Sequence, residues 1–239
     1  MRERYDQVAA AHYAAYRPPL HSLILQRVFS EAEFFDVGLD VGCGTGYSAI
    51  ALAAHSAHVY GVDLSPAMLR QAAPHEKVSY HSGSAEGIPL PEHAVDVVTF
   101  AGSLSYTDRA ATGAELRRVC RGGAIAVAYD FEIRLEEVLQ RFGVEPQAQN
   151  SAYDHQANVS EIAGFELLDV GSGRVRLTLT ASELAHLLLS DSNRFDRFAE
   201  GFGVPDPFPK LRSELDQDNA ERRLEADIYY SKHRVIGAG

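Results

Sequence analysis

Cysteine is scarce in this chain of 239 residues, where it occurs only at Cys43 and Cys120. Cys43 lies in a glycine-rich turn and Cys120 precedes a predicted strand, so we expect no disulfide, and a reducing compartment suits the chain. The sequence contains neither an H-E-x-x-H nor a C-x-x-C arrangement among its 10 histidines and 2 cysteines. Because zinc sites commonly use such spacings, we predict no metal site.

Long hydrophobic runs and an excess of basic residues are also lacking. No run of about 18 apolar residues occurs, and the first residues, Arg2-Glu3-Arg4-Tyr5-Asp6, form no apolar signal core, so we expect a cytoplasmic protein without a membrane span. Lys and Arg number 22 against 33 Asp and Glu, which gives a net charge of -11. Nucleic acid and anionic lipid are bound mainly through Lys and Arg, so the expected partner is a small molecule.

A glycine-rich turn between a strand and a helix organises the rest of the chain. Residues 37–41 form an apolar run that predicts a short buried strand, and an alanine-rich helical pattern begins at about Tyr47. Gly42, Gly44 and Gly46 alternate between them. Such a turn lets a ligand approach the backbone closely.

The glycine spacing separates two kinds of ligand. A dinucleotide fingerprint requires G-x-G-x-x-G, whereas this turn reads G-x-G-x-G and Tyr47 stands where the third glycine would be. Asp40, on the strand just before the turn, would repel a pyrophosphate and suits a ligand with positive charge. The stretch resembles motif I of the class I S-adenosylmethionine (SAM) methyltransferases, whose ligand carries a sulfonium and an ammonium. That resemblance implies that Asp40, Gly42, Cys43 and Gly44 bind the cofactor.

A second strand, residues 58–63, ends in an acid at the distance from the turn that nucleotide-binding folds use. A carboxylate about 20 residues beyond the turn can accept hydrogen bonds from both ribose hydroxyls. Since Ser65-Pro66 supplies the cap of the next helix, we expect Asp63 to be free for the ligand. An alternative is a carboxylate that only favours the helix N-terminus. Leu64, beside Asp63, is assigned to the same cofactor site.

A polar loop follows a short third strand at residues 77–81. Its sequence, Gly83-Ser84-Ala85-Glu86-Gly87-Ile88-Pro89-Leu90, resembles the G-D-A-E-x-L-P loop that reads the adenine ring in the family. The resemblance assigns Ser84, Ala85 and Glu86 to the cofactor. Ser84 replaces the family's acid, and its hydroxyl can still accept a hydrogen bond. The alternative is an ordinary surface loop.

Residues 94–100 form a fourth, continuously apolar strand, which suits a parallel sheet covered on both faces. In such sheets ligands bind beyond the carboxyl ends of the strands. By resemblance, Ala101 contacts SAM through its backbone. Tyr106 stands where the family often has an aromatic residue facing the substrate, and packing is an equally good interpretation of it.

The next segment predicts a helix over residues 110–119 and a fifth strand over residues 124–128. Gly122-Gly123 between them resembles the end of the family's L-x-R-V-L-x-P-G-G turn, and it predicts the helix stop. Tyr129 and Asp130 close the strand. Together with Tyr106 they are our candidates for a catalytic base, although Asp130 could equally be a solvated acid at a strand end.

The N-terminal region predicts a helix over residues 4–16 that ends at Arg17-Pro18-Pro19, and a second helix over residues 20–29. Three tyrosines lie along one face of the first helix, which could simply pack on the core. The segment also resembles one in which aromatic and arginine side chains close over the methionine end of SAM. That resemblance assigns Tyr13 and Arg17 to a helical lid in residues 1–34, with the SAM-binding domain in residues 35–239.

The C-terminal half is less regular. Helices are predicted over residues 135–142, over a segment capped by Thr180 through Thr180-Ala181-Ser182-Glu183, and over residues 210–224. Strands are predicted over residues 164–170, over residues 174–180 after a turn at Gly171 and Gly173, and over residues 227–236.

These elements predict an α/β fold with one Rossmann-like, doubly wound and mostly parallel sheet. The resemblance adds seven strands in the order 3-2-1-4-5-7-6. It implies a small-molecule methyltransferase similar to the ubiquinone and menaquinone type, with SAM as cofactor and S-adenosyl-L-homocysteine as product. Other readings are another SAM-using enzyme on the same scaffold, a SAM-binding subunit without catalysis and, least favoured, a nicotinamide enzyme. The acceptor atom (N, O or C) and the oligomeric state, a homodimer included, are left open.

Overall fold

A computed structural model describes residues 8–9, 11–13, 15–145, 153–160, 162–217 and 222–236. Tyr5 and the beginning of the predicted helix over residues 4–16 lie outside the described residues. So does part of the stretch between the fifth strand and residue 160.

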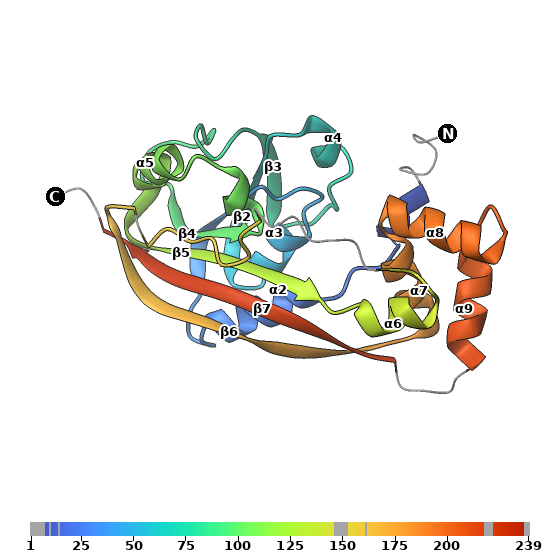
Figure 1. Ribbon diagram of the computed structural model, residues 1–239. Helices are drawn as coiled ribbons and strands as arrows, with labels where there is room; N and C mark the ends of the chain where they lie inside the picture. The colour runs from blue at the N-terminus through green and yellow to red at the C-terminus, as the bar shows by residue number, and fades with distance from the viewer. Residues whose placement is uncertain are drawn as a thin grey trace. The chain divides into compact units, whose positions relative to one another are not determined.

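The sheet has seven strands in the order β3-β2-β1-β4-β5-β7-β6, which confirms the predicted order. Pairing is parallel from β3 through β2, β1 and β4 to β5, as expected for strands that are apolar on both faces. The strands, shown in Figure 1, are β1 (Phe35–Val41), β2 (Ser56–Asp63), β3 (Val78–Ser82), β4 (Val95–Ala101), β5 (Cys120–Ile133), β6 (Phe165–Leu179) and β7 (Arg222–Val235).

The helices connect these strands in the alternating order that the sequence predicts. They are α2 (Leu20–Val28), α3 (Tyr47–Leu52), α4 (Pro66–Leu69), η1 (Ser103–Tyr106, a 3-10 turn), α5 (Arg109–Val119), α6 (Glu136–Arg141), α7 (Ala181–Leu189), α8 (Ser192–Phe202) and α9 (Phe208–Gln217). Side-chain caps begin several of them as the sequence indicates. Ser65 accepts from the amide of Met68, and Thr180 forms a capping box with Glu183.

The contacts group the chain into two units, each of them discontinuous in sequence. The sheet unit comprises Pro19–Phe131, Ala152–Gly173 and Ile228–Gly239. The helical unit comprises Met1–Pro18, Glu132–Ser151 and Arg174–Asp227, and it contains α6 to α9. The contacts do not divide the chain at residue 34. A lid in residues 1–34, separate from a SAM-binding domain in residues 35–239, stays a prediction.

The sheet unit holds a hydrophobic core built on the central strands. Leu39 on β1 and Phe100 on β4 are almost fully buried, and Leu116 on α5 packs in the same cluster. Burying one such side chain stabilises the fold by about 1.5–3 kcal/mol. This core fixes the carboxyl ends of β1, β2 and β4, where the functional residues gather.

Two predictions about where helices end are wrong. Helix α5 ends at Cys120, which is already extended, so Gly122-Gly123 does not stop the helix but lies within β5. There the register against β4 shifts between Val95 and Val97, as in a β-bulge. The helix predicted over residues 210–224 ends at Gln217, and β7 already begins at Arg222.

The predicted turn at Gly171 and Gly173 is also absent, because β6 runs unbroken through both residues. The two glycines serve close approach instead. A Cβ at Gly171 would lie 2.6 Å from the Tyr230 ring, and one at Gly173 would lie 2.9 Å from the Arg27 guanidinium. Glycine marks either a turn or a tight contact, and here it marks the contact.

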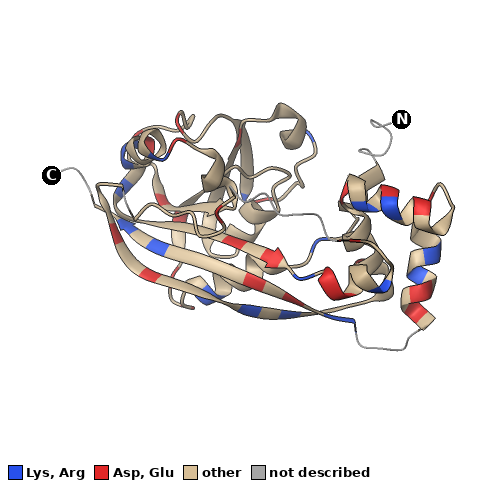
Figure 2. Ribbon diagram, viewed as in Figure 1, with Lys and Arg blue, Asp and Glu red and all other residues tan. Residues whose placement is uncertain are grey.

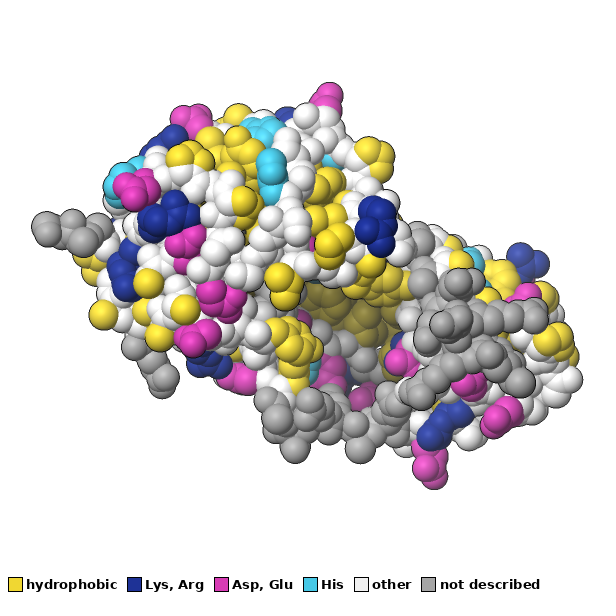
Figure 3. Space-filling model, turned by 90° about the horizontal axis from the view of Figure 1, so that it is seen from above, with side chains coloured by type: hydrophobic (Ala, Val, Ile, Leu, Met, Phe, Trp, Pro, Cys, Tyr) yellow, Lys and Arg dark blue, Asp and Glu magenta, His cyan; other side chains and the backbone are white. Residues whose placement is uncertain are grey.

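Charged residues are interspersed over both units. Figure 2 shows both acidic and basic positions on β6 and β7 and on α8 and α9, and Figure 3 shows both signs scattered among hydrophobic side chains. Within the helical unit, Arg174 pairs with Glu225 and Asp227 at 3.0 Å. Neighbouring carboxylates thus engage basic side chains, a pattern that suits a small-molecule partner better than a polyanion.

Candidate active site

The glycine turn after β1 has the backbone geometry that the sequence predicts. Gly42, Gly44 and Gly46 have φ values of 73°, 53° and 89°, a region that residues with a Cβ rarely adopt. A Cβ at Gly42 would overlap Ser103, and one at Gly46 would overlap Tyr80. Nothing lies within 4 Å of the same position at Gly44. The turn is therefore packed at both ends and open in the middle, where a ligand can approach the backbone.

Asp40 is fully buried on β1, two residues before the first glycine of this turn. Ser48 Oγ donates to its Oδ2 at 2.5 Å, and Thr99 Oγ1 donates to its Oδ1 at 2.8 Å. Burial raises the pKa of Asp40 to about 6, and the nearby charge of Asp63 adds to the rise. The carboxylate thus joins β1, α3 and β4, and its contact with a positive ligand stays a prediction.

Asp63 reaches the glycine turn from the end of β2. Its Oδ2 accepts from the amide of Gly44 at 2.8 Å, and its Oδ1 accepts from the amide of Ser65 at 2.8 Å. Asp63 therefore has two protein partners, and its contact with a ligand stays a prediction. A carboxylate has about four acceptor sites, so two stay available for hydroxyl groups. The sequence spacing nevertheless brought the acid to the predicted place.

The remaining cofactor candidates surround this turn on the sheet unit. Leu64 is 73 % exposed, an unusual state for a leucine and one suited to packing against a flat ring. The Cys43 side chain is buried, which raises the pKa of its thiol well above the usual value. Cys43 can therefore contribute its backbone and not a thiolate nucleophile.

Contacts within the loop and with the loop after β4 hold the segment that is predicted to bind adenine. Ala85 is buried, and Ser84 forms an isolated bridge with Gly87. The Glu86 carboxylate accepts from the amide of Asp108 at 3.0 Å, so it already has a partner across the next loop. The roles of Ser84, Ala85 and Glu86 toward a cofactor stay predictions.

Strand β4 ends next to the glycine turn, beside β5, which continues to Ile133. Ala101 pairs with Tyr129, and the following Gly102 has a φ of 72°. Ser103 Oγ then donates to the Val41 carbonyl at 2.5 Å, which ties this loop to the end of β1. Ala101 is thus placed at the sheet edge that the sequence predicts for it.

The structure ranks the three candidate bases. The Tyr129 side chain is buried, and its hydroxyl lies 3.0 Å from His21 Nδ1 on α2. Burial raises the pKa of Tyr129 well above the usual value. The hydroxyl therefore keeps its own proton and is unsuited to accept another. Tyr106 is 79 % exposed, and its ring lies 5.6 Å from that of Tyr153. Asp130 is the most engaged of the three.

Asp130 lies within β5 and does not close it as predicted, because the strand continues to Ile133, and it collects three donors there. The amide of Phe131 donates to its Oδ1, while the Tyr153 hydroxyl and His155 Nδ1 both lie 2.8 Å from its Oδ2. Tyr153 and His155 were missed from the sequence, since their segment has no periodicity. The only available signal was the run Tyr153-Asp154-His155, which places three polar side chains together after a predicted helix.

Tyr13 and Arg17, the predicted lid residues, belong to the helical unit. The Arg17 guanidinium lies 3.1 Å from the centroid of the Tyr13 ring, a cation–π contact. Their contact with the cofactor stays a prediction.

Two searches of the described residues bear on other kinds of site. No group of three or more His, Cys, Asp or Glu side chains there could hold a metal ion. In the same residues, no helix has the length and apolar character that a bilayer span requires.

The chain was compared with known proteins and structures. Residues 39–128 match the family model described as "Methyltransferase domain". The chain is 31% identical over 140 residues to malonyl-[acyl-carrier protein] O-methyltransferase of Dechloromonas aromatica, covering 55% of this chain and 52% of that protein. It is 40% identical over 93 residues to ubiquinone biosynthesis O-methyltransferase of Aromatoleum aromaticum, covering 36% and 39%. The matches thus span about half of these curated relatives or less.

A solved structure supports the fold over nearly the whole chain. It is a protein from Anaeromyxobacter dehalogenans, provisionally described as a type II methyltransferase, with a TM-score of 0.65 and 23% identity. The match covers 93% of this chain and 98% of that one. Residues 39–128 thus carry a methyltransferase domain, and the strand order and this structural match show the fold around it.

Proposed function

We propose that the protein transfers a methyl group from SAM to a small-molecule acceptor. The observation that carries the proposal is the junction of Gly44 and Asp63, where an open glycine turn meets a carboxylate with acceptor sites to spare. It lies inside the segment that matches the methyltransferase domain.

The residues present fit SAM. Asp63 can accept from the ribose hydroxyls, Leu64 offers an apolar surface to the adenine, and the buried charge of Asp40 favours a cation above it. Bound SAM would supply an electrophilic methyl group on sulfur. The protein's contribution is to hold the acceptor in line with that methyl, since positioning makes a two-body step effectively unimolecular.

The names of the relatives favour one acceptor atom. Two relatives are named as O-methyltransferases, and oxygen is therefore the first acceptor atom to test. The buried, unpaired cysteines suit a reducing compartment, so we propose the cytoplasm as the location.

Thermal unfolding with SAM, S-adenosylhomocysteine or NAD tests the cofactor. At about 100 times the dissociation constant a ligand of the native state adds roughly 2.7 kcal/mol, or roughly 5–11 °C for a chain of this size. We expect this rise with the two sulfur nucleotides only, and we expect Asp63→Asn to lose most of it.

Asp36→Asn is the matched control, because Asp36 is an exposed acid on the same sheet unit, near the start of β1. It should keep the full rise. A folded protein, freed of carried-over nucleotide, that responds to neither sulfur nucleotide would refute the proposal.

A further inference from the structure

His155 is held as a base would be held. Its Nδ1 lies 2.8 Å from Asp130 Oδ2, and the carboxylate is itself fixed by the Tyr153 hydroxyl. The His155 ring stacks on Tyr229 at a centroid distance of 5.8 Å and meets the Tyr153 ring edge-on at 4.8 Å. No hydrogen bond to its Nε2 occurs among the described residues. An Nδ1–H donated to Asp130 leaves the Nε2 lone pair available for a proton.

A chain of contacts joins His155 to the glycine turn. Gly42 packs on Ser103, and the neighbouring Gly102 has room for no side chain, since a Cβ there would lie 3.1 Å from Asp130 Oδ1. Asp130 in turn contacts His155. All these residues belong to the sheet unit. Gly42 and Gly102 directly follow the carboxyl ends of β1 and β4, and Asp130 lies beside them on β5, on the edge where the cofactor is proposed to bind.

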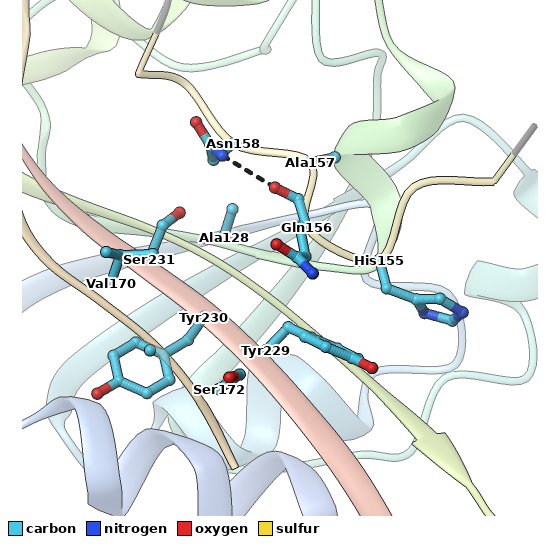
Figure 4. Close-up of a pocket in the computed structure, with 11 residues that line it drawn as sticks. Ala128, His155, Gln156, Ala157, Asn158, Val170, Ser172, Tyr229, Tyr230 and Ser231 are labelled. Carbon is cyan, nitrogen blue, oxygen red and sulfur yellow. Dashed lines mark hydrogen bonds between the residues drawn. The ribbon is translucent and has the colours of Figure 1, made fainter.

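A pocket with a volume of about 280 Å³ opens beside His155 on one face of the sheet. On β5, Tyr129 points toward α2, so its neighbours Ala128 and Asp130 point to the opposite face. The pocket lies on that opposite face, between the strands and the segment that follows His155 (Figure 4). A smaller cavity shares Ala128 and His155 with it and reaches Gly102 and Asp130.

Among the residues that the structure describes, the lining of the pocket is polar and aromatic and carries no permanent charge. It consists of Ala128, His155, Gln156, Ala157, Asn158, Val170, Gly171, Ser172, Tyr229, Tyr230 and Ser231. Without Lys or Arg it has no partner for a carboxylate or phosphate, and without Asp or Glu it has none for an ammonium group. The ring of Tyr229 offers apolar contact area to a flat ligand, whereas the Tyr230 ring points to the other side of β7 and packs on Gly171 (Figure 4).

One polar atom in this lining lacks a partner. Ser231 is only 4 % exposed, and its Oγ is buried without a hydrogen bond among the described residues. Leaving a buried hydroxyl unpaired costs about 1–3 kcal/mol, so such atoms in native proteins call for an explanation. Rotation of the Ser231 side chain toward the pocket would bring this hydroxyl to a ligand hydroxyl or carbonyl, which would satisfy it.

We propose that this pocket binds the methyl acceptor, that the acceptor is a neutral aromatic compound with a hydroxyl group, and that His155 is the catalytic base. The inference rests on the proposed methyl transfer. As the acceptor oxygen forms its bond to the methyl carbon, the hydroxyl proton passes to His155 Nε2. The bond between carbon and sulfur breaks, and its electron pair stays on sulfur, which loses its positive charge. Asp130 stabilises the imidazolium until the proton leaves to water.

The alternative role for the pair is structural, in which Asp130 only fastens the segment after residue 152 to β5. Chemical rescue separates the two roles. Removing the ring in His155→Ala leaves a space that added imidazole can enter, and imidazole restores proton transfer but cannot restore a lost fold contact.

The test offers SAM with a labelled methyl group and four probes, namely catechol, phenol, aniline and benzoate. We expect label in catechol or phenol and not in aniline or benzoate. His155→Gln should lower kcat about 100-fold or more, the range of general base catalysis, while the thermal shift with SAM is unchanged. Imidazole should recover part of the rate of His155→Ala. His58→Gln, on β2, is the matched control and should keep full activity.

Ser231→Ala tests the pocket separately. Since its hydroxyl has no partner among the described residues, the variant should be at least as stable as the parent and should show a raised KM for catechol. Label in aniline or benzoate instead, no label in any probe, or an active His155→Gln variant would overturn the inference. A protein that also fails to bind SAM would overturn the proposed function itself, and the thermal shift distinguishes the two failures.

Discussion

Asp40→Asn is the most informative single change to the fold, because it isolates a buried charge. The folded protein raises the pKa of Asp40 from 3.8 to about 6. The folded carboxyl therefore keeps its proton to a higher pH than the unfolded chain does, so the native state loses stability as the pH rises through this window. The full shift corresponds to about 3 kcal/mol above pH 6.

Asparagine keeps the shape and removes the charge. Its oxygen can accept from Ser48, and the Thr99 hydroxyl can turn to the Leu39 carbonyl, which lies 3.5 Å away. We therefore expect Asp40→Asn to be more stable than the parent by about 3 kcal/mol at pH 8, or roughly 6–12 °C, and by less than about 1 kcal/mol at pH 4.

Urea unfolding of both proteins at several pH values between 4 and 8 measures this difference. Asp36→Asn, which removes an exposed acid, should show no such trend. Equal stabilities of Asp40→Asn and the parent at pH 8, or a less stable variant, would refute the reasoning, because burial would then not dominate the pKa of Asp40. If Asp40 also faces the charge of SAM, the stabilised variant should bind SAM more weakly.

Two further predictions concern backbone geometry. Gly46→Ala should destabilise the protein by about 1–3 kcal/mol, since its φ of 89° is strained for alanine and Tyr80 fills the adjoining space. Gly44→Ala, which meets no atoms, should lose less stability yet bind SAM more weakly, and chemical unfolding with and without SAM compares them. Thr180→Ala removes the capping box with Glu183 and should cost about 1 kcal/mol, measured by the same unfolding experiment. An unchanged midpoint would show that the helix has another stabilising contact at that end.

The sequence predicted the parts of the site that depend on local order. A strand, alternating glycines and a helix follow one another within residues 35–52, so periodicity and turn chemistry sufficed. Asp63 was placed correctly because β1 and β2 are adjacent parallel strands, whose ends meet at one edge. Its bond to the Gly44 amide was not predicted, since the spacing says nothing of side-chain direction.

The parts that failed depend on contacts between distant segments. His155 meets Asp130 only after the chain has passed through α6 and an irregular stretch, which no local pattern encodes. Gly171 was taken for a turn because glycine next to alternating residues fits a hairpin equally well. Only the Tyr230 ring, from the far end of the chain, shows why a side chain is excluded there.

Asp63 has a consequence for how the site can change over evolutionary time. One carboxylate fastens the Gly44 turn and the Ser65 turn, and the same carboxylate is proposed to receive the ribose. A substitution of Asp63 that alters cofactor choice therefore also removes the hydrogen bonds that hold the Gly44 and Ser65 turns. Ser231, in the proposed acceptor pocket, differs because its hydroxyl bonds to no described residue. A substitution there can change the acceptor without removing a hydrogen bond within the protein. Descendants of this chain are thus freer to exchange acceptors than to exchange the cofactor.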